Sequence, residues 1–278
     1  MLRIGLVQAC SGLDPQKNAD FLRESAARLA DQDAEIVFTP EMSGLLDRNT
    51  ARLKEQVRPE SSDVSLTALR AVAAEKQIAI VAGSLAIAER DGRIANRCFV
   101  IDRTGAIVAR YDKLHLFDVD LPNGDRYRES ATFSAGDAAM AVQFDWGMLG
   151  LAICYDVRFP ALFSALAGAG ASVLSVPAAF TVPTGEAHWH VLLRARAIET
   201  GAFVVAAAQS GLHEDGRETF GHSLVVDPWG RVLLDMERAV GTARIDLDVA
   251  MVAETRARIA NLRHARPLPP VQLAGPAA

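Results

Sequence analysis

The sequence is poor in cysteine and has no excess of positive charge, and each shortage excludes a class of protein. Its three cysteines, Cys10, Cys98 and Cys154, are odd in number and widely spaced. This excludes a disulfide framework and a cysteine-based zinc site, and it favours a reducing cytoplasm. The formal net charge is −5. Proteins that bind nucleic acid present strongly basic surfaces, so we expect no nucleic-acid partner.

Long uninterrupted hydrophobic runs are also missing. The most apolar stretch, around residues 161–182, contains several glycines and Pro177, so it predicts short elements rather than a membrane span. The opening MLRIGLVQACSG lacks the apolar core and small-residue cleavage site of a signal peptide and favours a first strand. We therefore expect a protein that does not enter a membrane.

Hydrophobic residues make up 50% of the 278 residues, enough for a large core. No Ser/Gly linker or block of like charges divides the chain. The sequence therefore predicts a single domain over residues 1–265, followed by a loose tail over 266–278 that begins in PLPPVQ.

Apolar strand-like runs alternate with segments of helical spacing. We predict strands over 2–9, 34–41, 78–89, 148–154, 171–180 and 202–210, helices over 15–32, 64–77, 160–171, 188–200 and 248–263, and hairpins over 97–113 and 221–235. Helices between strands, together with two hairpins, predict mixed sheets covered by helices in a layered α/β or α+β sandwich. The two halves share this rhythm, which indicates pseudo-symmetry.

Cys154, in GLAICYDVRFP, is the cysteine whose surroundings raise the question of chemistry. It follows an apolar run and precedes a polar loop and a helix beginning at Pro160, which places it at the carboxyl end of a strand, where α/β sheets bind ligands. A helix N-terminus or a nearby cation would favour its thiolate. A buried structural cysteine is the alternative, and it is the interpretation we give to Cys10 and Cys98.

A nucleophilic cysteine needs a base, and the sequence offers two kinds. Six histidines make a Cys-His hydrolase conceivable, but none stands in a supporting local motif. His188 and His190 are two apart, so on a helix they do not share a face, and we do not expect them to bind a metal together. The other kind is a carboxylate after a strand, such as Glu41 in FTPEMSG.

Glu41 in TPE, Lys113 in YDKLHLF, Glu129 in YRES and Cys154 in ICYDVRFP occur in an order that resembles the nitrilase superfamily of carbon–nitrogen hydrolases. The similarity extends from GLVQ at residue 5 to GHSLVVDPWG at 221–230. The resemblance implies a four-layer α-β-β-α sandwich of the nitrilase type with mixed sheets, and a homodimer or larger assembly. It also implies cysteine-dependent hydrolysis without a metal or organic cofactor.

The resemblance assigns catalysis to Glu41, Lys113 and Cys154, with Glu129 near the active site. Glu41 would take the thiol proton and later activate water, while Cys154 attacks an amide carbon and a thioester forms. Lys113 and the backbone N–H of Tyr155 would stabilise the oxyanion. Glu129 would position Lys113 or the substrate.

The segments LHLFDVDLPNG, HWHVLLRARAIET, AAAQSG and VDPWG look most like the branch that contains ω-amidase and deaminated-glutathione amidase. That branch implies a primary amide of a 2-oxo acid, such as 2-oxoglutaramate or deaminated glutathione, with ammonia as product. Such substrates carry carboxylates, so Arg158, Arg194 and Arg196 are candidate substrate-binding residues. The same arginines could instead form internal ion pairs or a subunit interface.

Two positions depart from the family pattern: Ala161 stands where RFPE has glutamate, and His190 where HWE has glutamate. They leave the substrate and the subunit packing open. An N-carbamoyl amino acid amidohydrolase or a nitrilase with the same catalytic residues is therefore an alternative. A protein of another class, a catalytically silent binding or scaffold protein of the same fold, is a further one.

Overall fold

The computed structural model describes residues 1–121 and 124–274. Its strands form two large sheets and two short hairpins. The first sheet contains β1 (Leu2–Gln8), β2 (Ile36–Phe38), β3 (Ala79–Ala88), β4 (Ile94–Ile101), β5 (Ile107–Asp112), β8 (Phe133–Ser134) and β17 (Gly241–Leu247). The second contains β9 (Met140–Phe144), β10 (Gly147–Leu151), β11 (Ala171–Ser175), β12 (Phe203–Ala206), β15 (Leu224–Val226) and β16 (Val232–Asp235).

The two sheets have matching topologies. Their strand orders are β17-β1-β2-β3-β4-β5 and β9-β10-β11-β12-β15-β16. In each sheet, the three strands next to the first edge strand run parallel to one another, and the last two strands form an antiparallel hairpin. The edge strands β17 and β9 are antiparallel to their neighbours. The pseudo-symmetry expected from the sequence is therefore present in the strand order.

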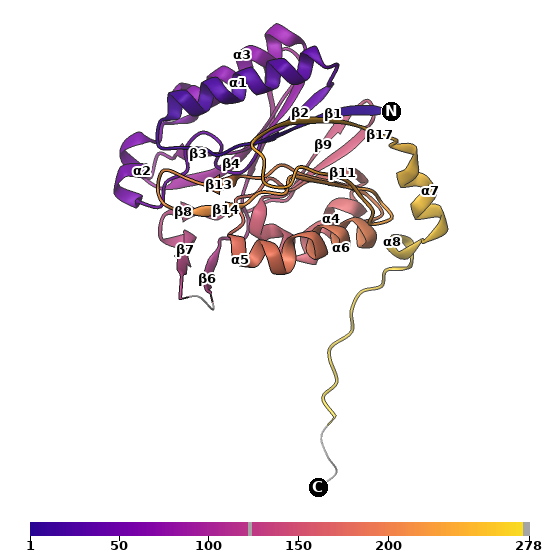
Figure 1. Cartoon of the computed structure of the whole chain (residues 1–278). Coiled ribbons are helices and arrows are strands. Elements are labelled where there is room, and N and C mark those ends of the chain that lie inside the picture. Colours follow the sequence, from indigo (N-terminus) through magenta and orange to yellow (C-terminus); the bar gives the residue numbers. More distant parts are fainter. Residues whose placement is uncertain (122–123, 275–278) are drawn as a thin grey trace.

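Helices cover the outer face of each sheet, which gives four layers (Figure 1). On one side lie α1 (Pro15–Asp31) and α3 (Val64–Lys76), and on the other α4 (Pro160–Gly168) and α6 (His190–Thr200). One core lies between the sheets, with Phe38 and Val100 of the first packed with Leu151 and Val204 of the second. The predicted α-β-β-α sandwich with mixed sheets is confirmed.

Local chemistry explains why these elements begin and end where they do. Asp14 caps α1 by accepting hydrogen bonds from the N–H groups of Gln16 and Lys17, and Pro15 occupies the first turn. The buried residues Leu22, Ala26 and Leu29 recur on one face of that helix. At the end of α6, Gly201 has a φ of 57°, the left-handed conformation that favours glycine.

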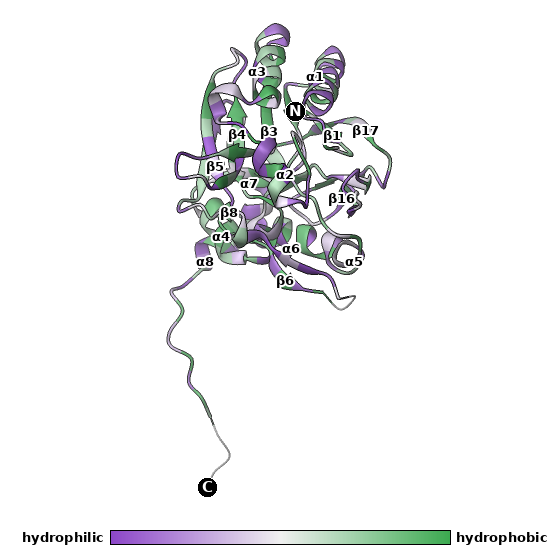
Figure 2. Cartoon of the chain, turned by 90° about the vertical axis from the view of Figure 1, so that its left-hand side faces the viewer, coloured by the Kyte–Doolittle hydropathy of each residue, from purple (hydrophilic) through white to green (hydrophobic). Residues whose placement is uncertain are grey.

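The remaining elements are short. The helices are α2 (Thr50–Gln56), α5 (Val182–Thr184), α7 (Ala250–Arg258), α8 (Asn261–His264), the 3₁₀ turns Glu60–Ser62, Glu129–Ala131 and Cys154–Arg158, and the π turn Gly185–Trp189. The hairpins are β6 (Asp118–Asp120) with β7 (Arg126–Arg128), and β13 (Ser210–Leu212) with β14 (Glu218–Phe220). Figure 2 shows the arm at β6 largely in the hydrophilic colour.

Two sequence predictions need correction here. The helix predicted over 248–263 is two helices, because Ile259 leaves the helical conformation and ends α7. The break brings Asn261 to the end of α6, where its side-chain amide donates to the carbonyl of Glu199 (2.6 Å). Cys10 is exposed beyond the end of β1 rather than buried, whereas Cys98 is buried in β4. All three thiols are free.

The chain after α8 leaves the sandwich as an exposed segment over residues 265–274 with neither helix nor strand (Figure 1). Residues 275–278 of the predicted tail, and residues 122–123 of the LHLFDVDLPNG motif, lie outside the described residues. No helix of the described chain is long and apolar enough to cross a bilayer.

Candidate active site

The four residues Glu41, Lys113, Glu129 and Cys154 line one cavity of about 750 Å³. Glu41 and Cys154 follow β2 and β10, central parallel strands of opposite sheets, and Lys113 follows β5. Parallel strands present their carboxyl ends at one edge of a sheet, so chain segments far apart in sequence meet there. The structure thus brings together the four residues that the sequence analysis selected.

Glu41 is held by the loop that follows β2. Its Oε2 accepts a hydrogen bond from the N–H of Ala179 (2.8 Å), and its carbonyl oxygen accepts one from the Gln209 side chain (3.0 Å). Gly83 of β3 runs beside this loop, and a Cβ at residue 83 would lie 1.8 Å from the carbonyl oxygen of Thr39. Glycine therefore permits the close approach that positions the carboxylate.

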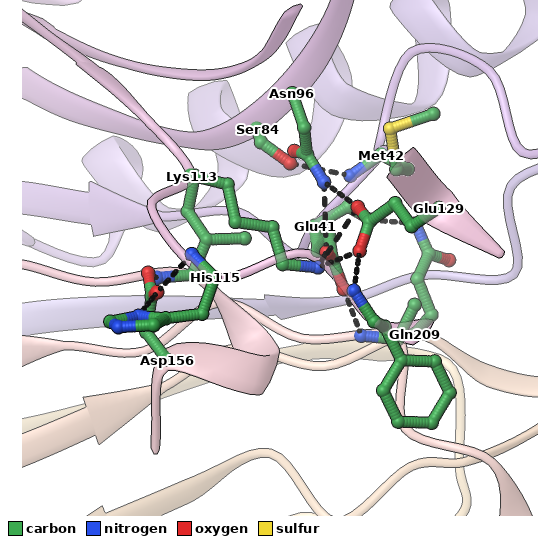
Figure 3. Close-up of polar contacts among 12 residues, drawn as sticks. Glu41, Met42, Ser84, Asn96, Lys113, His115, Glu129, Asp156 and Gln209 are labelled. Carbon is green, nitrogen blue, oxygen red and sulfur yellow. Dashed lines mark hydrogen bonds and ion pairs between the residues drawn. The ribbon is translucent and has the colours of Figure 1, made fainter. Parts of the chain in front are cut away.

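Lys113 lies between two carboxylates (Figure 3). Its Nζ is 2.9 Å from Oε1 of Glu41 and 2.9 Å from Oε2 of Glu129. The lysine is only 2% exposed and Glu41 4%, so solvent screens this pair little. Glu129 is fixed further by the N–H of Phe117, which donates to its Oε2 (2.6 Å).

Asn96 is a member of this cluster that the sequence analysis missed. It lies in β4, and its Nδ2 donates to Oε1 of both Glu41 (3.0 Å) and Glu129 (3.1 Å). A polar residue inside the apolar run IANRCFVI was the available signal, because buried polar side chains need partners. Asn96 thus bridges the two carboxylates that contact Lys113.

Cys154 opens a 3₁₀ turn, Cys154–Arg158, directly after β10. Its φ of 48° is a left-handed conformation that a residue with a Cβ seldom adopts, and such strain is common at functional positions. Its N–H donates to the carbonyl of Pro177 (2.8 Å), which ties the turn to the end of β11. Tyr155, the next residue, also lines the cavity.

Asp156 supports this turn from behind and was not given a role from sequence. Its buried carboxylate accepts hydrogen bonds from the N–H of Ile153 (2.8 Å) and the hydroxyl of Tyr111 (2.6 Å). It also contacts Nδ1 of His115 (2.7 Å) (Figure 3). These bonds link the cysteine turn to β5 and to the segment after Lys113.

The electrostatics favour an ionised glutamate next to a protonated thiol. Burial alone raises the pKa of Glu41, but the charge and hydrogen bond of Lys113, with bonds from Cys154 and Asn96, outweigh it and lower that pKa. Burial and the carboxylate of Glu41 raise the pKa of Cys154 well above 9.0, although Lys113 opposes this. Burial lowers the pKa of Lys113, but Glu129 and Glu41 raise it by more, so the net shift is upward and the ammonium stays charged.

The three arginines predicted from charge do not line the cavity. Arg196 is buried and donates to the carbonyl of Val157 (2.8 Å), and Arg194 donates to the carbonyl of Gly230 (2.8 Å). Arg158 lies over the rings of Tyr155 and Phe180. Arg194 and Arg196 thus make the internal contacts that the sequence analysis kept as the alternative.

The cationic side chains that do line the cavity mouth come from loops and hairpins: Arg48, Arg126, Arg128 and Arg217. Arg48 and Arg217 both approach the buried carboxylate of Asp215, at 4.0 and 3.7 Å. Both guanidinium groups flank this one carboxylate, while Asp47, Asp125 and Glu218 also line the cavity. Arg126 and Arg128 pair with Asp120 of β6.

The chain resembles known proteins over nearly its whole length. The chain is 36% identical over 266 residues to deaminated glutathione amidase of Yersinia enterocolitica, covering 95% of this chain and 92% of that protein. The NitFhit protein of Caenorhabditis elegans superposes with a TM-score of 0.88 at 36% identity, over 95% of this chain and 65% of that longer chain.

A variant of the amidase from Nesterenkonia sp. AN1, whose structure shows acrylamide added to the active-site cysteine, superposes with a TM-score of 0.78. It is 30% identical and covers 94% of this chain and 98% of that one. The carbon-nitrogen hydrolase family model matches residues 3–257. The chain therefore belongs to the carbon-nitrogen hydrolase family of the nitrilase superfamily.

Proposed function

We propose that this carbon-nitrogen hydrolase cleaves the primary amide of a small 2-oxo carboxylic acid and releases ammonia through a thioester on Cys154. The observation that supports it most is the buried contact of Lys113 with Glu41 beside the Cys154 thiol, in one cavity. Deaminated glutathione and 2-oxoglutaramate are the candidate substrates.

The reaction begins with a neutral thiol, because the pKa of Cys154 is raised. Glu41 is ionised and takes the thiol proton as sulfur attacks the amide carbon. Negative charge then develops on the amide oxygen. Lys113 and the N–H of Tyr155 are the proposed donors to it, the latter because first-turn N–H groups of a helix have no partner within the helix.

The tetrahedral intermediate collapses when the C–N bond breaks. The proton held by Glu41 passes to the departing nitrogen, ammonia leaves, and the acyl group remains as a thioester. Glu41, ionised again, takes a proton from water, whose oxygen attacks the thioester carbon. The acid is released and the proton returns to the sulfur. Glu129 keeps Lys113 in place through both of its oxygens.

The substrate class is proposed from the mouth of the cavity. Arg48 and Arg217, which share Asp215, can receive a carboxylate at a distance from the reacting carbon. Guanidinium groups bind carboxylates through paired N–H donors, so an anionic amide fits better than a neutral one. This assignment replaces Arg158, Arg194 and Arg196 as the candidate substrate anchors.

A panel of substrates tests the proposal by ammonia release. It contains 2-oxoglutaramate, deaminated glutathione, a neutral aliphatic amide, an aliphatic nitrile and an N-carbamoyl amino acid. We expect the highest kcat/KM for the anionic 2-oxo amides. A higher kcat/KM for the nitrile or the N-carbamoyl compound would favour one of those alternatives, and no turnover with any compound would favour a binding or scaffold protein.

We further propose a cytoplasmic location and a homodimer or larger assembly. Exposed apolar side chains of α6 and the β15–β16 hairpin, Val191, Ile198 and Trp229, offer a surface for self-association. Sedimentation velocity of the full chain measures the assembly. A monomer at micromolar concentration would contradict it.

A further inference from the structure

A second cluster of chemically active side chains lies outside the catalytic residues. His190 is the first residue of α6, His222 precedes β15, and Asp235 ends β16. Oδ2 of Asp235 is 3.0 Å from Nε2 of His190, and Oδ1 is 2.9 Å from Nδ1 of His222. His190 and His222, which are 45 and 13 positions away from Asp235 in the sequence, thus meet at its carboxylate.

We propose that His190, His222 and Asp235 form a binding site for a divalent transition metal ion, with Zn²⁺ as the best match. Two imidazole nitrogens and one carboxylate oxygen are the donors that Zn²⁺ takes in three-ligand protein sites, with water as the fourth ligand. The ligand atoms lie within 4.8 Å of one another. Tetrahedral bonds of about 2.0–2.1 Å place ligand atoms about 3.4 Å apart, so modest side-chain rotation closes the site.

The surrounding contacts hold two of the ligands in position. The N–H of Glu237 donates to Oδ1 of Asp235 (2.8 Å), and the N–H of His222 donates to the carbonyl of Glu237 (2.5 Å). The ring of His222 stacks on Phe220, with centroids 4.3 Å apart. The indole N–H of Trp189 donates to the carbonyl of His222 (2.8 Å). Such supporting bonds orient metal ligands before the ion arrives.

Access also suits a cation. The three side chains are 36%, 20% and 28% exposed for His190, His222 and Asp235, so an ion can enter from solvent. The cluster is separate from Cys154 and Glu41, so the proposed ion takes no part in amide hydrolysis.

His188 provides the matched control. It lies two residues before His190, and its Nδ1 is 3.3 Å from Nη2 of Arg158. The two histidines therefore contact different partners, as their spacing predicts. The partners of His190 lie just before and at the end of the β15–β16 hairpin, and the spacing within the HWH motif cannot reveal them. His188→Gln therefore removes an imidazole from the same turn without touching the proposed ligands.

The test measures Zn²⁺ binding to the full chain by competition with a chromophoric chelator. Variants are His190→Gln, His222→Asn and Asp235→Asn, with His188→Gln as control. Asparagine at 222 tolerates the positive φ of 55° and can keep a donor toward Asp235, which protects the fold. We expect each ligand variant to weaken Zn²⁺ affinity at least about tenfold, while His188→Gln leaves it unchanged.

Nitrogen-detected NMR of ¹⁵N-histidine-labelled protein gives a second readout that is independent of the catalytic thiol. The chain has six histidines. One equivalent of Zn²⁺ should shift the ring signals of two of them, and both shifts should vanish in His190→Gln and His222→Asn. Equal affinity in all variants, or shifts at other histidines, would show a hydrogen-bonded cluster only and would overturn the proposal without affecting the proposed amidase reaction.

Discussion

The floor and the mouth of the catalytic cavity are built in opposite ways. At the floor, Glu41 and Lys113 are buried at strand ends and every charge has a partner within 3.0 Å. At the mouth, the side chain of Arg48 is 57% exposed and extends from a loop, and its guanidinium approaches Asp215 only to 4.0 Å. The floor is preorganised for one reaction, whereas the mouth has charges that a substrate can still use.

The largest expected effect comes from removing Cys154, the proposed nucleophile at the floor. Cys154→Ala should lower ammonia release by about 10⁴-fold or more, since the thioester cannot form. Cys10→Ala, which removes an exposed thiol, is the control and should keep full activity. A Cys154→Ala protein that retains more than a few per cent of the rate would contradict the assignment.

The second effect compares a buried ion pair with a surface one. Lys113→Met leaves the buried carboxylate of Glu41 and the partly buried one of Glu129 without their cation, which should cost about 3–5 kcal/mol of unfolding free energy. It should also lower kcat by about 10²–10³-fold, because Lys113 is a proposed donor to the oxyanion. Lys76→Met, which breaks a surface contact with Asp31, should change neither quantity. Urea unfolding and ammonia release measure both, and a stable, active Lys113→Met protein would refute the role of the cluster.

A third prediction concerns the protonation of the thiol. Because the pKa of Cys154 is raised above 9.0, the thiolate fraction grows with pH through neutrality and beyond. The ultraviolet absorbance of the Cys154 thiolate, taken as the difference between the protein and its Cys154→Ala variant, should thus be absent at neutral pH and grow as the pH rises. The difference removes the contributions of Cys10, Cys98 and the tyrosines. A full thiolate signal at neutral pH would indicate a preformed thiolate and remove the need for Glu41 as base.

The smallest effect is expected at the mouth. Arg217→Gln should raise KM for an anionic 2-oxo amide about tenfold and leave kcat nearly unchanged, because the charge contacts the substrate away from the reacting carbon. Its KM for a neutral amide should not change. Arg110→Gln, whose partner Glu60 lies away from the cavity, is the control. An equal loss for neutral and anionic amides would show that Arg217 only supports the fold.

The same contrast explains what could be predicted from sequence. Strand periodicity places Glu41, Lys113 and Cys154 directly after apolar runs, but their catalytic roles were assigned by the resemblance to the nitrilase superfamily, because each residue taken alone has an ordinary structural interpretation. Arg194 and Arg196 were selected as candidate substrate anchors by charge, and charge does not reveal that their guanidinium groups contact backbone carbonyls and do not line the cavity. The mouth arginines lie on short hairpins and loops whose position depends on tertiary packing.

Asn96 and Asp156 were missed for a related reason. Each acts through hydrogen bonds to residues distant in sequence, such as Glu41 for Asn96 and Tyr111 for Asp156. A polar residue in an apolar strand, or an acid after a cysteine, signals that partners exist but does not name them. The HWH motif behaves likewise, because the partners of His190 are far along the chain.

The central claim is that Cys154 carries the acyl group during amide hydrolysis. Rapid acid quenching of the enzyme with 2-oxoglutaramate or deaminated glutathione, followed by peptide mass spectrometry, tests it most directly. We predict that the peptide containing Cys154 gains the mass of the substrate acyl group, meaning the substrate minus ammonia, at the rate of the first turnover. Ammonia release in that first turnover without this mass on Cys154 would contradict the account.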